Sequence, residues 1–299
     1  MRHFAPDRTT RGKKMARNAF ARLEESAWGS AGVAAAYERG FARVTTCAIA
    51  PLLRAVAMSP SERRDASLLD VACGLGALAR AAAASGRYAR VVGADFSEAM
   101  IVRATTHSAG STESTPLHFV HADAARLPFE AHAFDAVTCA FGVLHMPEPR
   151  AFFAEAARVL RPGGRFAFAV WCPPPATEGY EIMLGATAQH AVDLPEGPPM
   201  FEFADGPSVC GALGAVGFEG VRSIAHDMVW ELDSAADFWS AVKDGTARTR
   251  AHIAALTDAQ RREVKEAVLR ACATRVSADG RLRLQMPCVI SSATRASRE

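Results

Sequence analysis

The segment from Ser67 to Arg80, SLLDVACGLGALAR, constrains the fold of this chain more than any other. A short apolar run ends in a carboxylate, two glycines follow two residues apart, and an alanine-rich amphipathic segment comes next. This pattern predicts a strand, a tight turn and a helix. Gly74 and Gly76 permit positive φ in the turn and let a ligand approach the bare backbone. Because the first turn of the helix presents unpaired N–H groups there, the segment indicates a binding loop for a nucleotide-type cofactor.

Four more apolar runs follow this segment and alternate with helical patterns. They end at Asp95, at Asp123, near Phe141 and near Trp171. Strands that alternate with helices at this spacing predict βαβ crossovers and a mainly parallel sheet covered on both faces. We expect a sixth strand over residues 217–233 and a β-rich segment over residues 281–294.

The alternation of strand and helix patterns also divides the chain into parts. Residues 1–17 are basic and polar and predict a flexible tail. Residues 18–65 carry aromatic and aliphatic side chains at helical spacing and predict an N-terminal helical lid. Residues 66–299 hold the alternating unit, and we expect cap insertions in it at about 173–200 and 235–280, where the rhythm breaks.

The overall composition excludes several classes of protein. A formal net charge of +2 provides no basic excess for a nucleic-acid partner. No apolar run approaches the roughly 18 residues that would span a bilayer, and the N-terminal stretch lacks the features of a secretion signal. The seven cysteines form no CxxC pair, which favours buried reduced thiols over disulfides or zinc. We therefore expect a cytoplasmic protein with no metal site, no membrane insertion and no nucleic-acid partner.

Polar residues follow the ends of four predicted strands: Asp70, Asp95, Asp123 and His145. In an open parallel sheet the ligand lies at the carboxyl ends of the strands, where the strand order reverses. Four such residues at one edge indicate a binding site rather than four solvated loops. If the sixth strand runs parallel to the others, both cap insertions leave from the same edge and form a roof over the site.

The glycine segment alone fits two kinds of cofactor. Gly74-x-Gly76-x-x-Ala79, with Asp95 nineteen residues beyond Gly76, also satisfies the dinucleotide fingerprint, in which the acidic residue binds the ribose hydroxyls. By itself this pattern supports NAD as well as any other nucleoside cofactor.

Four segments in unbroken order carry a wider resemblance: DVACGLGALA, VVGADFSEAM, HADAARLPFEAHAFDAVTCAFGVLHM and FFAEAARVLRPGGRFAFAVW. Over about residues 66–172 the chain closely resembles the class I S-adenosylmethionine-dependent methyltransferases, in the branch of the ubiquinone/menaquinone-biosynthesis and natural-product small-molecule methyltransferases. A dinucleotide enzyme has no reason to show the aspartate before the glycines or the D-x-x-x-L-P-F element. The resemblance implies an α/β, Rossmann-like fold with a seven-stranded, mostly parallel sheet, helices on both faces and helical cap elements. It also implies S-adenosyl-L-methionine as the cofactor and a role in secondary metabolism.

The resemblance assigns cofactor contacts to the loop and to the end of the second strand. Asp70 resembles the acidic residue that orients the methionine end of the cofactor, directly or through water. Ala72, Gly74 and Gly76 resemble the loop against which that end lies, with Ala72 in place of the usual first glycine. Asp95 resembles the carboxylate that accepts both ribose hydroxyls, since an ionised carboxylate takes two donors at once.

The resemblance also implies contacts around the adenine and the sulfonium. Phe96 and Met100 would pack on the adenine. Asp123 and Ala124 would meet its amino group and ring nitrogen, and Phe141 would lie near the sulfonium.

Several of these residues also have a purely structural interpretation. Asp70 and Asp123 could cap strand ends, and Met100 could be a core residue on a helix face. Tyr37 and Trp28 lie in the N-terminal helices, which in related enzymes fold over the cofactor. We include Tyr37 among the expected cofactor contacts.

The implied reaction is an in-line displacement in which the acceptor attacks the methyl carbon, while the protein supplies proximity, alignment and exclusion of water. His145 is the leading candidate for a general base, because an imidazole suits proton removal at neutral pH. His190 and His226 are weaker alternatives. The roof region is rich in aromatic and methionine side chains, which favours a partly apolar or aromatic small molecule as the acceptor. These are Trp171, Tyr180, Met183, Phe201, Phe203, Met228, Trp230 and Trp239.

Two other functions are alternatives to methyl transfer to a small molecule. A member of the fold can bind the cofactor and perform other chemistry or serve as a non-catalytic partner, because a fold does not determine a function. A nucleic-acid methyltransferase would show a basic face and a motif such as Asn-Pro-Pro-Tyr after the fourth strand, and CAFGVLH contains neither Pro-Pro nor a Pro-Cys pair. The sequence leaves open the identity of the acceptor, the atom methylated and the oligomeric state.

Overall fold

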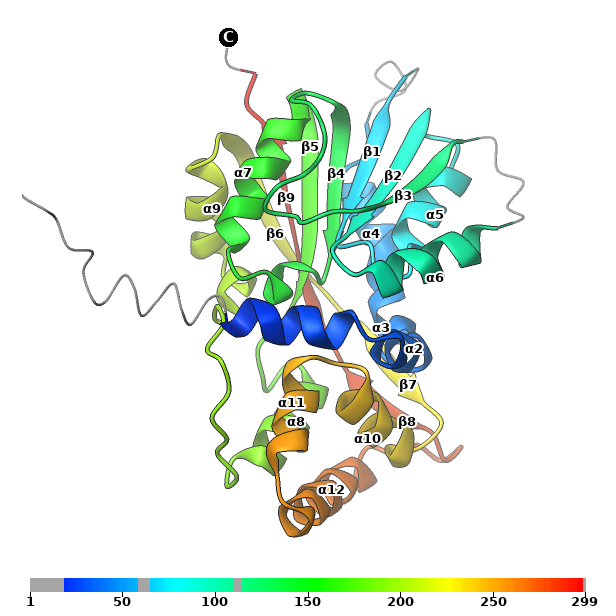
Figure 1. The fold of residues 1–299 in the computed structure, drawn as a ribbon, viewed down its shortest axis with the longest axis vertical. Helices are drawn as coiled ribbons and strands as arrows, with labels where there is room; N and C mark the ends of the chain where they lie inside the picture. Colours follow the sequence, from blue (N-terminus) through cyan, green and yellow to red (C-terminus); the bar gives the residue numbers. More distant parts are fainter. Residues whose placement is uncertain (1–18, 59–64, 110–114, 298–299) are drawn as a thin grey trace, which may run out of the picture.

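The computed structural model describes residues 19–58, 65–109 and 115–297, so the expected tail over residues 1–17 lies outside the described residues. The centre of the structure is a seven-stranded sheet with the order β3-β2-β1-β4-β5-β9-β6 (Figure 1). Its strands are β1 (Ser67–Val71), β2 (Arg90–Asp95), β3 (Leu117–His121), β4 (Phe134–Ala140), β5 (Leu160–Trp171), β6 (Phe218–His226) and β9 (Cys288–Arg295). Strands β1 to β5 pair in parallel, and β9 runs antiparallel to both β5 and β6. Strand β6 therefore points the same way as β5, and the prediction of a mostly parallel seven-stranded sheet is confirmed.

The expected sixth strand over residues 217–233 is in fact two strands. Strand β6 is followed by β7 (Val229–Leu232), which pairs with β8 (Leu282–Gln285) in a separate two-stranded sheet. The break between β8 and β9 contains Pro287, which has no N–H to donate to a neighbouring strand. The backbone N–H of Met286 still donates to the carbonyl oxygen of Met228 at 2.8 Å. The pairing of β6 with β9 therefore ends next to Pro287, and on the other side of the proline β7 and β8 form a separate two-stranded ribbon.

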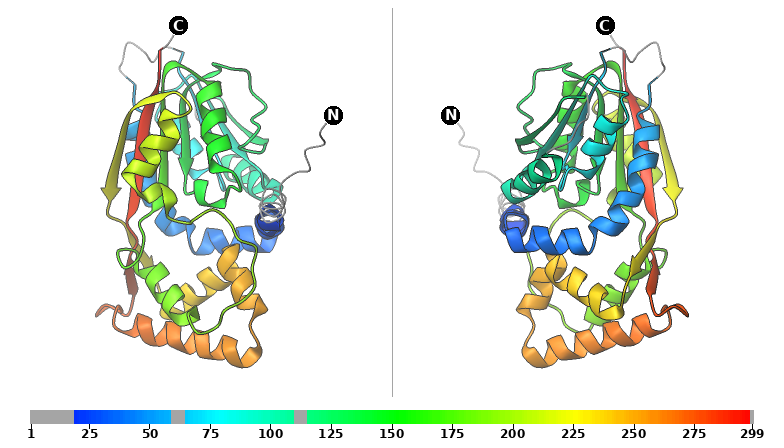
Figure 2. Two further views of the ribbon diagram at one scale, coloured as in Figure 1. Left: turned by 90° about the vertical axis from the view of Figure 1, so that its left-hand side faces the viewer. Right: turned by 90° about the vertical axis from the view of Figure 1, so that its right-hand side faces the viewer.

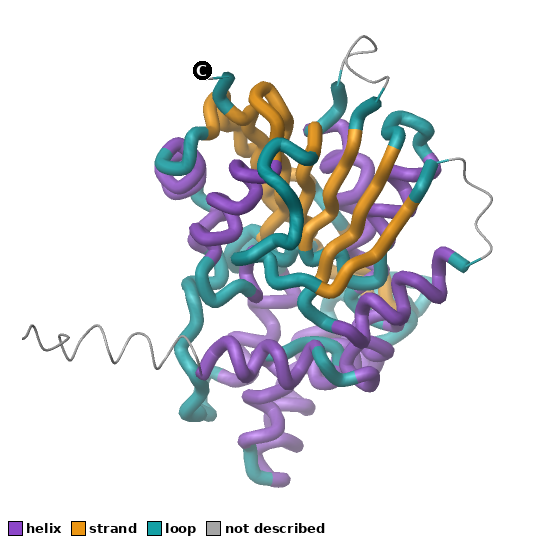
Figure 3. The backbone as a smooth tube through the Cα atoms, turned by 45° about the horizontal axis from the view of Figure 1, so that its top comes forward, coloured by secondary structure: helices purple, strands orange, loops and turns teal. Residues whose placement is uncertain are grey.

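Helices cover both faces of the seven-stranded sheet (Figure 3). They are α4 (Ile49–Ala55), α5 (Ala77–Ala84), α6 (Glu98–Ser108), α7 (Pro149–Val159) and α9 (Gly206–Gly214). Successive strand residues point to opposite faces, so Leu68 belongs to the core that contains α4 and α5, whereas Leu69 belongs to the core that contains α7 and α9. Because both faces of the central strands β1, β2 and β4 are buried, these strands appear in the sequence as continuous apolar runs.

A layer of helices lies beyond the carboxyl ends of the parallel strands (Figures 1 and 2). It is built from helical residues 19–28, α2 (Ala31–Arg39), α3 (Ala42–Thr45), η1 (Thr46–Ala48), α8 (Glu178–Thr187), η4 (Glu202–Ala204), α10 (Ala235–Asp244), α11 (Arg248–Ala255) and α12 (Asp258–Ala273). Helix α12 begins with a reciprocal capping box between Thr257 and Gln260. Helix α10 packs on α2, and α12 packs on α8 and α10, so the segments after β5 and β7 meet the N-terminal helices there. In the described ranges, no helix has the length and apolar character needed to cross a membrane.

A glycine allows the N-terminal helices to approach this layer closely. Gly40 ends α2, and a Cβ on it would lie 2.5 Å from the Cβ and 3.3 Å from the Cα of Ala241 on α10. The close approach of α10 therefore favours glycine at this position.

We predict that Gly40→Ala lowers the free energy of unfolding by about 1–3 kcal/mol, because the added methyl group overpacks the contact with α10. Ala241→Gly removes the opposing methyl group, so the double variant should recover at least about 0.5 kcal/mol relative to the sum of the two single changes. Urea unfolding of the four proteins measures this coupling. Strictly additive effects would show that the two helices do not restrain each other at this contact.

Candidate functional site

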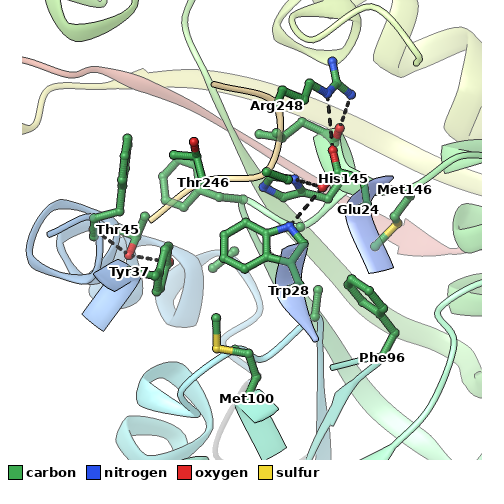
Figure 4. A pocket seen from close by; sticks show the side chains of 18 of the residues that line it. Glu24, Trp28, Tyr37, Thr45, Phe96, Met100, His145, Met146, Thr246 and Arg248 are labelled. Carbon is green, nitrogen blue, oxygen red and sulfur yellow. Dashed lines mark hydrogen bonds and ion pairs between the residues drawn. The ribbon is translucent and has the colours of Figure 1, made fainter. Parts of the chain in front are cut away.

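A cavity of about 530 Å³ lies between the carboxyl edge of the sheet and the helical layer. Its walls come from the N-terminal helices, from the loops after β1, β2, β3 and β4, and from the segments around α8, α10 and α11 (Figure 4). Asp95, Asp123 and His145 all line it, although they follow three different strands. The topology of the sheet therefore brings these residues to one place.

The glycine loop after β1 turns sharply beside this cavity. Ala72 and Gly74 line the cavity with φ values of 54° and 52°. A Cβ on Gly74 would meet nothing within 4 Å, so the backbone of this residue faces open space. Gly76 has a φ of 73°, and a Cβ on it would lie 2.6 Å from the Phe119 ring. Gly76 therefore packs against the protein, and it is not among the described residues that line the cavity.

Ala72 replaces the glycine that the resemblance leads one to expect, and its neighbour compensates for the change. A left-handed conformation costs an alanine about 1–2 kcal/mol. Gly142, after β4, lies opposite, and a Cβ on Gly142 would be 2.4 Å from the Cβ of Ala72. Because Gly142 has no side chain, the methyl group of Ala72 fits and the loop keeps its course.

The Asp95 carboxylate is held at the wall of the cavity by backbone N–H groups. Its Oδ2 accepts from Gly74 N at 2.8 Å, and its Oδ1 accepts from Ser97 N at 2.9 Å. The side chain is 6% exposed. Burial raises the pKa of Asp95, and the two backbone N–H groups oppose that rise. Each carboxylate oxygen still has a lone pair for a further donor.

Asp70 lies behind the loop rather than in the cavity wall. It is 1% exposed, and it is not among the described residues that line the cavity. Its Oδ1 accepts from Thr138 Oγ1 at 3.0 Å, and its carboxylate also accepts from the backbone N–H of Ala79 in the first turn of α5. Burial raises the pKa of Asp70 to about 7, against the effect of both hydrogen bonds. Asp70 therefore supports the helix that begins after the loop.

The remaining residues expected around a cofactor also line the cavity: Tyr37, Phe96, Met100, Ala124 and Phe141. Phe141 has a φ of 56°, which is rare for a residue with a side chain. The Oδ1 atom of Asp123 accepts from Ala125 N at 2.9 Å. The alternative bases His190 and His226 are not among the described residues of the cavity wall.

A buried carboxylate from the N-terminal helix joins three parts of the wall (Figure 4). Glu24 is 2% exposed, and its Oε2 lies 2.9 Å from Nδ1 of His145 and accepts from Nε1 of Trp28 at 2.9 Å. Its Oε1 lies 3.4 Å from Nε of Arg248, and Nη2 of Arg248 donates to the carbonyl oxygen of Leu144 at 2.7 Å. Glu24 therefore orients the His145 ring and connects it to the helical layer.

Glu24 and Arg248 were not expected from the sequence. Along the chain, Glu24 is 121 residues from His145 and 224 residues from Arg248, and no local motif marks such contacts. The spacing of Glu24 and Trp28, which puts both side chains on one face of a helix, was the one available signal.

The far side of the cavity, under the helical layer, is an aromatic chamber. We use this name for the group formed by Tyr37, Phe41, Trp171, Tyr180, Trp230 and Phe238. Trp171 stacks on Phe141 with ring centroids 4.1 Å apart, and the ring centroids of Trp230 and Phe41 are 4.4 Å apart. Of the aromatic and methionine residues expected in the roof, Trp171, Tyr180, Met183 and Trp230 line the cavity. The other four, Phe201, Phe203, Met228 and Trp239, are not among its described wall residues.

Comparison with known proteins agrees with this geometry. A family profile described as "Methyltransferase domain" matches residues 69–168. Over these residues the chain is similar to that family. The matched segment carries the glycine loop, Asp95, Asp123 and His145, whereas Glu24, Arg248 and the whole aromatic chamber lie outside it.

Individual relatives extend the comparison. The chain is 43% identical over 144 residues to the demethylmenaquinone methyltransferase of Clavibacter sepedonicus, a match that covers 47% of this chain and 55% of that protein. It is 42% identical over 110 residues to the ubiquinone/menaquinone biosynthesis C-methyltransferase UbiE of Brucella abortus (strain S19), covering 36% of this chain and 41% of that protein. The chain thus spans about half the length of the curated relatives it matches. These matches confirm the resemblance found in the sequence.

The fold likeness reaches beyond the matched segment. The structure of the YcgJ protein of Bacillus subtilis, at 16% identity, matches with a TM-score of 0.55 and covers 84% of this chain and 98% of that chain. The Rossmann-like fold is therefore shared over most of the chain. Among the described residues, no group of three or more His, Cys, Asp or Glu side chains is arranged to hold a metal ion.

The buried Asp70 predicts a pH-dependent stability. Its pKa is about 7 in the folded state against an ordinary value of 3.8, so the folded protein retains a proton in this window that the unfolded chain has lost. The free energy of unfolding should therefore fall as pH rises. We predict that the stability of the wild type relative to Asp70→Asn decreases by about 2–3 kcal/mol between pH 5 and pH 8. Urea unfolding at several pH values measures this difference.

Asp233→Asn is the matched control, because this carboxylate is 61% exposed. If the difference between the wild type and Asp70→Asn stayed constant over the same pH range, Asp70 would not carry a raised pKa in the folded protein.

Proposed function

We propose that the chain transfers a methyl group from S-adenosyl-L-methionine to an O, N, C or S atom of a small, partly aromatic or apolar metabolite. The observation that carries this proposal is that one cavity joins a glycine loop and a ribose-type carboxylate to an aromatic chamber. The relatives named as demethylmenaquinone and ubiquinone/menaquinone methyltransferases support both halves of the proposal.

The residues at the sheet edge fit this cofactor. Asp95 has lone pairs left for the ribose hydroxyls after its two backbone bonds are made. Gly74 leaves open space beside the backbone, where the methionine end would lie along Ala72 and Gly74. Phe96 and Met100 supply apolar surface for the adenine. Asp123, Ala124 and Phe141 would complete the contacts, with Tyr37 above them and Asp70 and Gly76 shaping the loop from behind.

When bound, the cofactor supplies a methyl carbon on a sulfonium, which is already a good leaving group. The chain then has to hold the acceptor in line with that carbon and exclude water, an effect worth up to about 7–11 kcal/mol. We propose that residues 18–65 act as a lid and that the segments at about 173–200 and 235–280 form the cap. The contact between the Glu24 carboxylate and the Arg248 side chain supports this assignment, because it joins the lid to the cap over the cavity.

His145 is the proposed general base for acceptors that must lose a proton. Its Nδ1 faces the Glu24 carboxylate at 2.9 Å, so in the neutral ring Nδ1 carries the hydrogen and Nε2 keeps its lone pair. His145 lines the cavity and is 26% exposed, which leaves the ring accessible to an acceptor. Trp28 packs edge-on to the ring with centroids 5.1 Å apart and limits its rotation.

The finer assignments belong to the same proposal. The names of the relatives favour an aromatic, quinol-type acceptor, and the aromatic chamber is suited to such a ring. A cytoplasmic location and a role in secondary metabolism are part of the proposal. The balanced formal charge of +2 supports a small-molecule partner rather than a nucleic acid.

We predict that the wild type binds S-adenosylmethionine and S-adenosylhomocysteine and does not bind NAD. Asp95→Ala should weaken S-adenosylhomocysteine binding by roughly 100-fold or more, because two charge-assisted hydrogen bonds are lost. Isothermal titration calorimetry measures these affinities, and Asp233→Asn is the control variant. Binding of NAD in place of the sulfonium cofactor would contradict the proposal.

We predict that His145→Ala lowers turnover by roughly 100-fold for an acceptor that must lose a proton, while the affinity for S-adenosylhomocysteine stays within a few-fold of the wild type. A screen of phenolic and quinol acceptors by product mass supplies the substrate, and single-turnover rates give the comparison. Turnover within a few-fold of the wild type would remove the base role. Cofactor binding without any methylated product in the screen would favour non-methyl-transfer chemistry.

A further inference from the structure

Trp230 carries a buried hydrogen-bond donor in the wall of the cavity. It lies on β7, in the two-stranded sheet that the family profile does not cover, and it is 0% exposed. It lines the cavity, and its Nε1 has no hydrogen-bond partner among the described residues. A buried indole N–H without an acceptor is costly and needs an explanation.

Neighbouring aromatic rings fix the position of this indole. Phe41 lies against it at a centroid distance of 4.4 Å, and Phe238 meets it edge-on at 5.5 Å. On β8, Leu284 is its cross-strand partner. These neighbours are apolar and offer the N–H no side-chain acceptor, so a molecule in the cavity is the available source of one.

The other two tryptophans of the cavity wall and the Tyr37–Thr45 pair have partners. Of the three tryptophans in the cavity wall, Trp28 donates to Glu24 and Trp171 is hydrogen-bonded to Tyr180. Thr45 donates to the carbonyl oxygen of Phe41 at 3.1 Å, which leaves the Tyr37 hydroxyl to donate to Thr45 Oγ1 at 3.0 Å. Of the three cavity tryptophans, Trp230 is therefore the one whose N–H has no partner among the described residues, and its surroundings are apolar.

We propose that Trp230 determines acceptor specificity by donating its indole N–H to an oxygen of the methyl acceptor. It selects a flat, largely apolar molecule with a carbonyl, ether or hydroxyl oxygen over a hydrocarbon of the same shape. This inference rests on the proposed function, since it names the substrate chemistry of the same cavity.

The test compares two ligands that differ by one oxygen acceptor, 1-tetralone and tetralin. Their affinities are measured by calorimetry on protein saturated with S-adenosylhomocysteine. Trp230→Phe keeps an aromatic ring and removes the donor, so the preference for 1-tetralone over tetralin should drop roughly five- to tenfold. Trp239→Phe is the matched control, because Trp239 is buried nearby on α10 and is not among the described cavity residues. It should leave the preference unchanged.

A measurement on the wild type does not depend on whether the variant folds. Of the four tryptophan indole N–H signals in a ¹⁵N–¹H spectrum, one should move downfield on addition of 1-tetralone and stay in place with tetralin. An equal preference for 1-tetralone in wild type and Trp230→Phe would overturn the inference, as would the absence of any such shift. If the wild type did not bind S-adenosylhomocysteine at all, the proposed function itself would be rejected, so the two failures are distinguishable.

Discussion

The hydrogen bonds around the Asp95 carboxylate hold the cavity together. One oxygen accepts from Gly74 in the loop after β1, and the other accepts from Ser97 at the start of α6. The Ser97 hydroxyl accepts from Met100 N and donates to the carbonyl oxygen of Trp28, at 2.6 Å, in the N-terminal helix. A single carboxylate and its neighbouring serine therefore order the loop, the helix and the N-terminal segment. Glu24 then joins that segment to His145 and Arg248 on the other side of the cavity.

This arrangement carries a cost in stability. Asp70 and Asp95 are both buried, and burial raises the pKa of each carboxyl group. Ala72 and Phe141 have positive φ on the cavity wall. Strain and buried charge of this kind persist where surrounding packing enforces them, and they cluster at functional sites. A ligand that brings positive charge and hydroxyl donors to the same place would offset part of this cost.

Much of the sheet edge could be predicted from the sequence, because strand ends and their following turns are local features. The apolar runs that end at Asp95 and Asp123 are enough to bring those residues to one edge of a parallel sheet. The division between β6 and β7 depends on Pro287, which lies 55 residues or more beyond the ends of both strands and interrupts the strand that pairs with them. Glu24 and Trp230 enter the site through packing between segments far apart in the chain, which periodicity alone does not encode.

A crystal structure with S-adenosylhomocysteine bound tests most directly whether this cavity is the cofactor site. We predict that the ribose hydroxyls bind Asp95, that the amino-acid end lies along Ala72 and Gly74, and that the sulfur points toward the aromatic chamber. A ligand bound elsewhere, or a ribose held by other side chains while Asp95 keeps only its two backbone partners, would contradict that assignment.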